Sequence, residues 1–218
     1  MSDPLPDPIP AATLILMRAR RSGAPELLMI ERSPDMVFAG GALAFPGGRI
    51  DPEDRAAAAR LPGADAAARI AALRETVEET GLGGELSPDM LTPFARWCPN
   101  FRETRRFDTL FFVAEAAADW PEPVAREAEA VRAFWASATE TLAEIAAGRA
   151  HAIFPTRRTL ERLAGFASIE EARVDAARHG LRKITPWIEE RGGEKFLCIP
   201  EDAGYPVTAE PLATARRA

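Results

Sequence analysis

The chain has 218 residues, of which 47% are hydrophobic and 28% are charged, as is ordinary for a globular protein of one full domain. Its formal net charge of -6 disfavours a nucleic-acid backbone as the main partner, because such partners favour basic surfaces. A small anionic substrate stays open, since a local basic cluster can hold one.

Cysteine usage and the N-terminal sequence indicate the compartment. Cys98 and Cys198 lie far apart and show neither a disulfide framework nor metal-ligand spacing, which favours a reducing environment. The Pro-rich, acidic start at 1–10 lacks the basic and apolar regions of a signal peptide. No apolar run is long enough to span a membrane. We therefore expect a cytoplasmic protein with no membrane partner.

The first predicted elements form a hairpin followed by a glycine turn. Apolar runs at 12–19 and 27–32 predict two strands, separated by a loop that contains Gly and Pro. A short apolar piece at 42–45 leads to the adjacent glycines Gly47 and Gly48. Paired glycines after a strand allow a tight turn or a close approach of the backbone to a ligand.

The next segment, 55–72, is rich in Ala and Arg and favours helix, but Pro62 and Gly63 interrupt it. We expect a short helix, a break and a second helix that ends at Gly81. The apolar face of this second helix, away from its carboxylates, is predicted to be formed by Ile70, Leu73 and Val77.

Strands and helices remain mixed through the rest of the chain, which predicts an α/β (α+β) domain with an α-rich C-terminal part. We expect a flexible leader at 1–11, one domain at 12–200 and a tail at 201–218. Strands are predicted at 93–98, 106–116 and 130–137, helices at 138–148, 155–166 and 168–180, and a hairpin within 184–200.

The run "LRETVEETGL" at 73–82 places Glu75, Glu78 and Glu79 at helical spacing. Like charges three and four residues apart repel and weaken a helix. One explanation is a solvated face, as most charge runs are. The other is a divalent cation among the carboxylates, since Mg²⁺ and Mn²⁺ prefer oxygen ligands.

Two neighbouring segments, "GGRIDPED" and "RETVEETGL", together resemble the Nudix box, the signature of the Nudix hydrolase family. The family pattern is Gly, five residues, Glu, seven residues, then Arg-Glu-apolar-X-Glu-Glu-X-Gly-apolar. Gly48 matches the opening glycine, so the box spans 48–82. The closing half is matched by Arg74, Glu75, Glu78, Glu79, Gly81 and Leu82.

The chain departs from this pattern at three places. Asp54 stands where the family has its first glutamate, a residue that is mainly structural in the family, and Thr76 takes the apolar position. Nineteen residues, 55–73, replace the usual seven, which makes a 12-residue insertion. The insertion leaves the carboxylate helix intact and can reshape the entrance to a substrate site.

The resemblance implies a Nudix-type α/β/α sandwich with a mixed sheet, and metal-dependent hydrolysis of a pyrophosphate bond in a nucleoside diphosphate linked to another group. Segments such as "TRRFDTLFF" and "FPTRRTLERLAGF" are similar to the branch that includes the peroxisomal coenzyme A diphosphatases and their bacterial relatives. Coenzyme A or acyl-coenzyme A is thus the first substrate. Alternatives are ADP-ribose, NADH and dinucleoside polyphosphates, or a non-catalytic nucleotide-sensing module, which typically lacks the metal glutamates present here.

By the same resemblance, Glu75, Glu78 and Glu79 hold Mg²⁺ or Mn²⁺ with the Gly47 carbonyl, and Arg74 orients the glutamates. Glu78 and Arg74 are the candidate catalytic residues. A glutamate from a later loop is the alternative base, and the candidates for it are Glu127 and Glu129; each taken alone is more typical of a solvated loop charge.

Arginines are expected to bind the substrate phosphates, because a guanidinium makes two hydrogen bonds to a phosphate. Arg105 and Arg106, with Arg102, form the main cluster; surface pairing with Glu103 or Asp108 is the alternative. Arg32 and Arg49 flank the approach to the box. The expected partner is a small nucleotide-type molecule, and a homodimer stays open.

Overall fold

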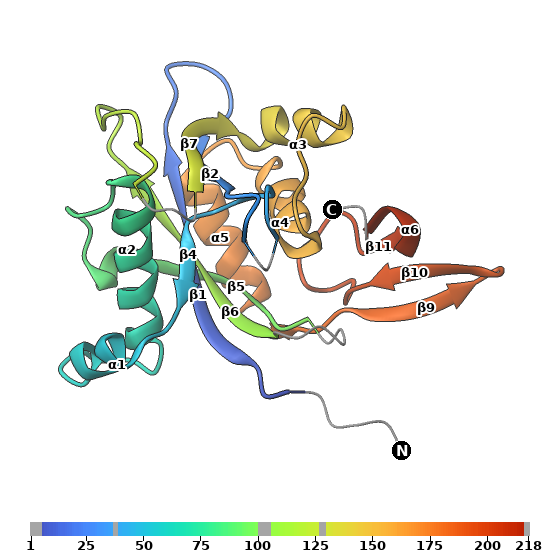
Figure 1. Cartoon of the computed structure of the whole chain (residues 1–218), viewed down its shortest axis with the longest axis horizontal. Coiled ribbons are helices and arrows are strands. Elements are labelled where there is room, and N and C mark those ends of the chain that lie inside the picture. The colour runs from blue at the N-terminus through green and yellow to red at the C-terminus, as the bar shows by residue number, and fades with distance from the viewer. Residues whose placement is uncertain (1–5, 37–38, 100–105, 127–129, 216–218) are drawn as a thin grey trace.

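The computed structural model describes residues 6–36, 39–99, 106–126 and 130–215. An eight-stranded mixed sheet forms the centre of the molecule, and a small three-stranded sheet projects from it near the C-terminus (Figure 1). Within the described ranges, no helix has both the length and the apolar character needed to cross a membrane.

The strands of the large sheet are β1 (Ile9–Arg18), β2 (Glu26–Arg32), β3 (Leu43–Ala44), β4 (Gly47–Arg49), β5 (Thr92–Trp97), β6 (Phe107–Ala116), β7 (Ala130–Ser137) and β8 (Lys183–Ile184). The small sheet contains β9 (Trp187–Arg191), β10 (Glu194–Cys198) and β11 (Ala209–Pro211). The helices are α1 (Pro52–Ala58), α2 (Ala66–Thr80), the 3₁₀ turn η1 (Pro88–Met90), α3 (Ala138–Ala146), α4 (Phe154–Leu163), α5 (Ile169–His179) and α6 (Leu212–Ala215).

The central strand β1 pairs in parallel with β6 over its whole length and antiparallel with β2 and β4. It is apolar on both faces, as expected for a strand that is covered on both sides. Leu14 and Leu16 belong to a core that also contains alanines of α2, whereas Ile15 and Met17 belong to the core under α4 and α5. Helices therefore cover both faces of the sheet, which confirms the predicted α/β/α sandwich (Figure 1).

Most predicted elements of the first half are confirmed. The two strands of the predicted hairpin pair through Met17 and Leu27. The helix break lies between α1 and α2, and α2 ends at Gly81, whose φ of 73° is the left-handed conformation that glycine adopts without strain.

The buried face of α2 differs from the prediction. Ala68, Ala71 and Ala72 are buried together with Thr76, whereas the larger Ile70, Leu73 and Val77 are only half-buried, and of these Leu73 packs against the core. Small side chains let the helix axis approach the sheet closely. The hydroxyl of Thr76 donates to the Ala72 carbonyl at 2.7 Å, which allows a polar residue in this core.

Both ends of the expected domain carry additional structure. β1 begins at Ile9, within the segment predicted as leader. After residue 200, Tyr205 is buried and its hydroxyl accepts a hydrogen bond from Trp97 Nε1 at 2.9 Å. β11 then pairs with β10. The segment at 201–215 therefore packs against the domain.

Candidate active site

The site begins where β4 crosses the carboxylate face of α2. The backbone N–H of Gly47 donates to Glu79 Oε2 at 2.9 Å. A Cβ atom added to Gly48 would lie 2.3 Å from Glu75 Oε1, and one added to Gly47 would lie 2.5 Å from the Ala12 carbonyl oxygen. Backbone packing therefore requires glycine at position 47, and a side chain at position 48 would displace the carboxylate of Glu75.

Arg74 lies at the centre of the carboxylates. Its guanidinium donates to both oxygens of Asp54 at 3.1 and 2.9 Å, to Glu75 Oε1 at 2.9 Å and to Glu78 Oε2 at 2.8 Å. It also donates to the Arg49 carbonyl at 3.1 Å. The hydrogen bonds with Asp54 are the largest of the influences that raise the pKa of Arg74, so its positive charge is fixed.

Asp54 positions Arg74 from the short helix α1. Its side chain is 2% exposed, and its Oδ2 also accepts the backbone N–H of Asp51, the N-cap residue of α1, at 2.9 Å. Asp54, at the first acidic position of the box, thus holds Arg74, and Arg74 in turn contacts Glu75 and Glu78. Although Asp is shorter than Glu, both of its oxygens accept hydrogen bonds from Arg74.

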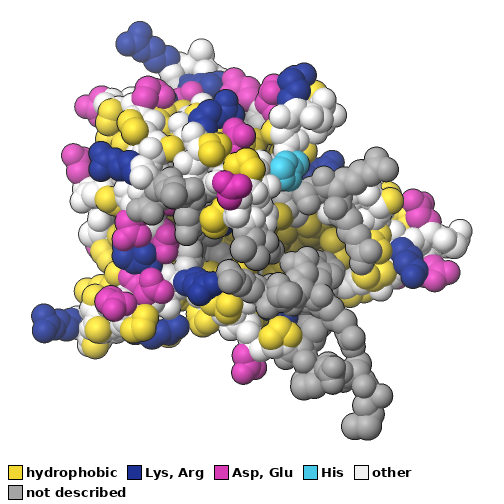
Figure 2. Space-filling model, viewed as in Figure 1, with side chains coloured by type: hydrophobic (Ala, Val, Ile, Leu, Met, Phe, Trp, Pro, Cys, Tyr) yellow, Lys and Arg dark blue, Asp and Glu magenta, His cyan; other side chains and the backbone are white. Residues whose placement is uncertain are grey.

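The acidic face keeps an excess of negative charge. Asp54, Glu75, Glu78 and Glu79 contribute four negative charges and Arg74 one positive charge, so this group carries a formal charge of -3. Acidic and basic side chains lie together over α1 and α2 on the face shown in Figure 2. Glu78 is the most open of the three glutamates, with 44% of its side chain exposed.

The donor chemistry of this face fits a hard divalent cation, because all the ligand atoms are carboxylate oxygens next to a backbone strand. In the described part of the chain, no three acidic, His or Cys side chains are gathered in a metal-binding arrangement. Glu75 and Glu78 turn toward Arg74, and Glu79 is held by Gly47. Arg74 therefore offsets part of the negative charge of the carboxylates in this structure.

The structure brings together six of the predicted site residues. These are Gly47, Arg49, Arg74, Glu75, Glu78 and Glu79. Arg105, Glu127 and Glu129 lie outside the described residues, as does Arg102. The arrangement is a carboxylate-rich helix face under a glycine strand, with an exposed arginine, Arg49, at its edge.

Arg106 and Arg32 have other contacts. Arg106 donates to the Pro6 carbonyl at 3.2 Å and toward Cys98 Sγ at 3.7 Å, so its guanidinium packs on the start of β1. Arg32 is half-buried at the end of β2, and its backbone pairs with Ala42 and Gly41.

A hollow of about 360 Å³ lies away from this site. It is lined by residues of η1, α5 and the end of β6, among them Met90, Glu115 and Arg173, and by none of the box residues. We assign the site from the carboxylate geometry, because this hollow has no comparable cluster of chemical groups.

The fold and the site together define a class: an α/β/α sandwich that presents several carboxylates from one helix to a glycine strand. A family model for the NUDIX domain matches residues 7–156. The chain belongs to the Nudix family. Family membership supports a pyrophosphohydrolase, an enzyme that hydrolyses a pyrophosphate bond in a nucleotide derivative.

Solved structures agree with this assignment. A NUDIX hydrolase from Alicyclobacillus acidocaldarius is 28% identical with a TM-score of 0.68, and the match covers 77% of this chain and 96% of that one. The NUDIX domain of Shewanella oneidensis NrtR, complexed with ADP ribose, is 16% identical with a TM-score of 0.52 and shares the fold; the match covers 73% of this chain and 90% of that one. No curated protein sequence matches the chain.

Proposed function

We propose that the chain catalyses metal-dependent hydrolysis of the pyrophosphate bond in a nucleoside diphosphate linked to another group, with coenzyme A or acyl-coenzyme A as the first substrate. The observation that carries this proposal is the carboxylate face of α2, which has a formal charge of -3 with Arg74 included. A solvated surface helix would not need Gly48 packed against Glu75 or the N–H of Gly47 bound to Glu79.

Glu75, Glu78 and Glu79 would hold Mg²⁺ or Mn²⁺, together with the carbonyl of Gly47. When bound, the ion polarises phosphoryl oxygens and lowers the pKa of bound water. Arg74, held by the buried Asp54, positions Glu75 and Glu78 by hydrogen bonds of 2.9 and 2.8 Å. These contacts keep the carboxylates oriented while their charges repel.

Glu78 is the candidate general base, because it is the most exposed of the three glutamates. Glu78 takes the proton of the attacking water, an oxygen–phosphorus bond forms and the anhydride oxygen–phosphorus bond breaks. The leaving group departs with the electron pair and carries a phosphate. Glu127 or Glu129 is the second candidate for this base.

Four arginines are candidates for binding the substrate phosphates: Arg32, Arg49, Arg105 and Arg106. Arg49 has the strongest support, because it is exposed and its own carbonyl accepts from Arg74. Arg106 is the weaker candidate, since its guanidinium already has contacts with Pro6 and Cys98.

Coenzyme A ranks first because the sequence resembles the coenzyme A diphosphatase branch over several segments. ADP-ribose, NADH and dinucleoside polyphosphates follow. The ADP-ribose complex of the Shewanella oneidensis protein is a likeness of fold alone at 16% identity, so it does not change this order. A nucleotide-sensing module is the other alternative, and the presence of all three glutamates favours the enzyme.

The test is incubation with coenzyme A, acyl-coenzyme A, ADP-ribose, NADH and diadenosine polyphosphates, with Mg²⁺, Mn²⁺ or chelator. Chromatography should show metal-dependent release of 3′,5′-ADP from coenzyme A. Cleavage of another compound would keep the reaction and change the substrate. Binding of metal and nucleotide without any cleavage would support the sensing module.

We also propose a cytoplasmic location and a single catalytic domain, predicted at 12–200 and extended in the structure by the start of β1 at Ile9 and by the packed segment 201–215, with a homodimer as an open alternative to a monomer. Support for a reducing compartment comes from Cys98 and Cys198, which are both free and buried. Light scattering coupled to size-exclusion chromatography would measure the oligomeric state.

A further inference from the structure

Arg126 lies against the end of the carboxylate helix. A Cβ atom added to Gly81 would lie 2.7 Å from Arg126 Nε, 2.9 Å from its Cζ and 3.0 Å from its Nη2. The guanidinium therefore occupies the space that a side chain at Gly81 would fill. The left-handed φ of 73° already favours glycine at this position, and the contact with Arg126 is a second reason for it.

The position of Arg126 is fixed by its backbone. Its N–H donates to the Glu79 carbonyl at 3.1 Å, and the N–H of Val124 donates to the Thr80 carbonyl at 3.0 Å. Carbonyls in the last turn of a helix have no partner within the helix. The segment 124–126 supplies two of these partners, so Arg126 is attached to the turn that carries Glu79.

Arg126 also lies close to the acidic residues along α2. Arg74 and Glu78 are at positions i and i+4 on one face of the helix, and Gly81 is the C-cap residue directly after Thr80. Gly81 is about 4.5 Å beyond Glu78 along the axis, at 1.5 Å per residue. The acidic face thus has Arg74 toward its N-terminal end and Arg126 at its C-terminal end.

The two arginines differ in their partners. Arg74 donates to Asp54, Glu75 and Glu78. The Arg126 side chain is exposed, and among the residues that the structure describes it has no hydrogen bond or ion pair. A guanidinium near a helix C-terminus is electrostatically favourable, and its open donors can make paired hydrogen bonds to a phosphate.

We propose that Arg126 is a diphosphate-binding residue of the active site, which contacts the anhydride phosphates of the nucleotide beside the glutamates. The inference deepens the proposed function and depends on α2 being the catalytic helix. The sequence predicted Arg106 as a phosphate-binding residue, but in this structure its guanidinium contacts Pro6 and Cys98. Arg126 would supply the positive charge instead, at the C-terminal end of α2.

The test compares Arg126→Ala, Arg126→Gln and Arg126→Lys with Arg178→Ala, an exposed arginine on α5 whose loss changes the charge equally. Calorimetry would measure the affinity for ADP, which carries a diphosphate, and for adenosine, which does not. Arg126→Ala and Arg126→Gln should weaken ADP binding about tenfold, the loss of one charge-assisted contact, and leave adenosine binding unchanged. Arg126→Lys should recover part of the ADP affinity, because it keeps the charge and loses the paired donors.

With any substrate that the chain cleaves, Arg126→Ala should raise KM about tenfold, and Arg178→Ala should not. Equal ADP affinities of Arg126→Ala and Arg178→Ala would overturn the assignment. A fall in kcat with unchanged ADP affinity would overturn it too, since Arg126 would then only position α2. Circular dichroism checks the fold, and Arg126→Gln keeps most of the packing on Gly81 if the Ala variant unfolds. If nothing is cleaved, the proposed function fails, while the ADP measurement still decides the role of Arg126.

Discussion

Two helices of this protein carry arginine–glutamate clusters of similar sequence, and only one of them is suited to chemistry. On α2, Arg74 contacts Asp54, Glu75 and Glu78. The second cluster is on α4 and is closed by a glutamate of β11. It consists of Arg157, Arg158, Glu161 and Glu210, with contacts of 2.6 Å from Arg158 to Glu161 and from Arg157 to Glu210.

The clusters differ in charge balance and burial. The α4 cluster has two positive and two negative groups, and Arg158 is 1% exposed. Burial lowers the pKa of Arg158 and raises that of Glu161, the effect of desolvation on charged groups. The α2 cluster has four carboxylates for one guanidinium and is partly open. A local excess of one charge at the surface therefore distinguishes a candidate binding site from a structural ion network.

The largest effect is expected from Glu79→Gln. The neutral amide oxygen can still accept from Gly47, so the fold should persist, but one negative charge of the proposed ion site is lost. Activity should fall about a thousandfold or more, because a bound metal contributes several kcal/mol to the reaction. Chromatographic assay of the cleaved substrate measures this. An active Glu79→Gln enzyme would contradict the metal assignment.

In the α4 cluster, Arg158→Met should lower the free energy of unfolding and leave the catalytic rate nearly unchanged. Removing Arg158 leaves Glu161 and Glu210 buried without it, which typically costs about 3 kcal/mol. Urea unfolding should show a lower midpoint, while kcat per folded molecule stays within about twofold. Arg149→Met, at an exposed pair with Glu144, is the control and should not move the midpoint. A large loss of kcat in Arg158→Met would remove the distinction between the two clusters.

Most features around α2 could be predicted from the sequence, because they depend on residues that are close together along the chain. The strands of the β1–β2 hairpin, the helix break and the stop at Gly81 follow from apolar runs and from Gly and Pro positions. The neighbourhood of Gly48 and Glu75 follows from the box pattern. Such features depend on residues that are close along the chain or on one recognised motif.

Long-range contacts could not be predicted in the same way. The buried face of α2 is lined by alanines, whose weak hydrophobicity gave the larger Ile70 and Val77 more weight in the sequence pattern. The contact of Arg126 with Gly81 joins segments that only the folded sheet brings together. The same holds for Arg106, whose contact with Pro6 depends on the parallel pairing of β1 with β6.

Asp54→Asn tests whether the α2 cluster depends on its buried member. The amide keeps the shape but gives up the charge that fixes Arg74. Activity should fall about tenfold, the usual cost of losing an outer partner of a metal ligand. Asp54→Glu, which restores the residue of the family pattern, should be more active than Asp54→Asn because it keeps the charge. Equal activity of Asp54→Asn and the unchanged protein would show that Arg74 needs no anchor.

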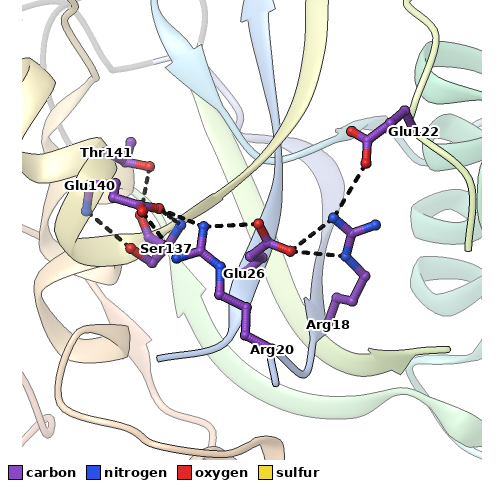
Figure 3. Close-up of polar contacts among 7 residues, drawn as sticks. All are labelled: Arg18, Arg20, Glu26, Glu122, Ser137, Glu140 and Thr141. Carbon is purple, nitrogen blue, oxygen red and sulfur yellow. Dashed lines mark hydrogen bonds and ion pairs between the residues drawn. The ribbon is translucent and has the colours of Figure 1, made fainter. Parts of the chain in front are cut away.

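The protein has a third arginine–glutamate network, which lies on the surface (Figure 3). Arg20 donates to both oxygens of Glu140 at 3.0 Å and also to Glu26 at 2.9 Å. The backbone N–H of Ser137, the N-cap residue of α3, donates to Glu140 at 2.7 Å. The network therefore joins the β1–β2 hairpin to the start of α3.

The smallest effect is expected from Glu140→Gln and should depend on pH. The hydrogen bonds from Arg20, and then from Ser137, lower the pKa of Glu140 from 4.5 to about 2. Because the folded pKa is the lower one, the stabilisation is present above pH 4.5 and is lost as the pH falls toward 2. Glu140 is 53% exposed, so the contribution should stay below about 1 kcal/mol.

Urea midpoints at pH 6 and pH 2.5 would measure this contribution. The unchanged protein should lose more stability between the two pH values than Glu140→Gln does, because the variant has no carboxylate to protonate at that position. Glu122→Gln is the matched control, since Glu122 is 78% exposed and lies 3.5 Å from Arg18 in the same network. Equal pH sensitivity of both variants would mean that the contacts of Glu140 with Arg20 and Ser137 do not stabilise the fold.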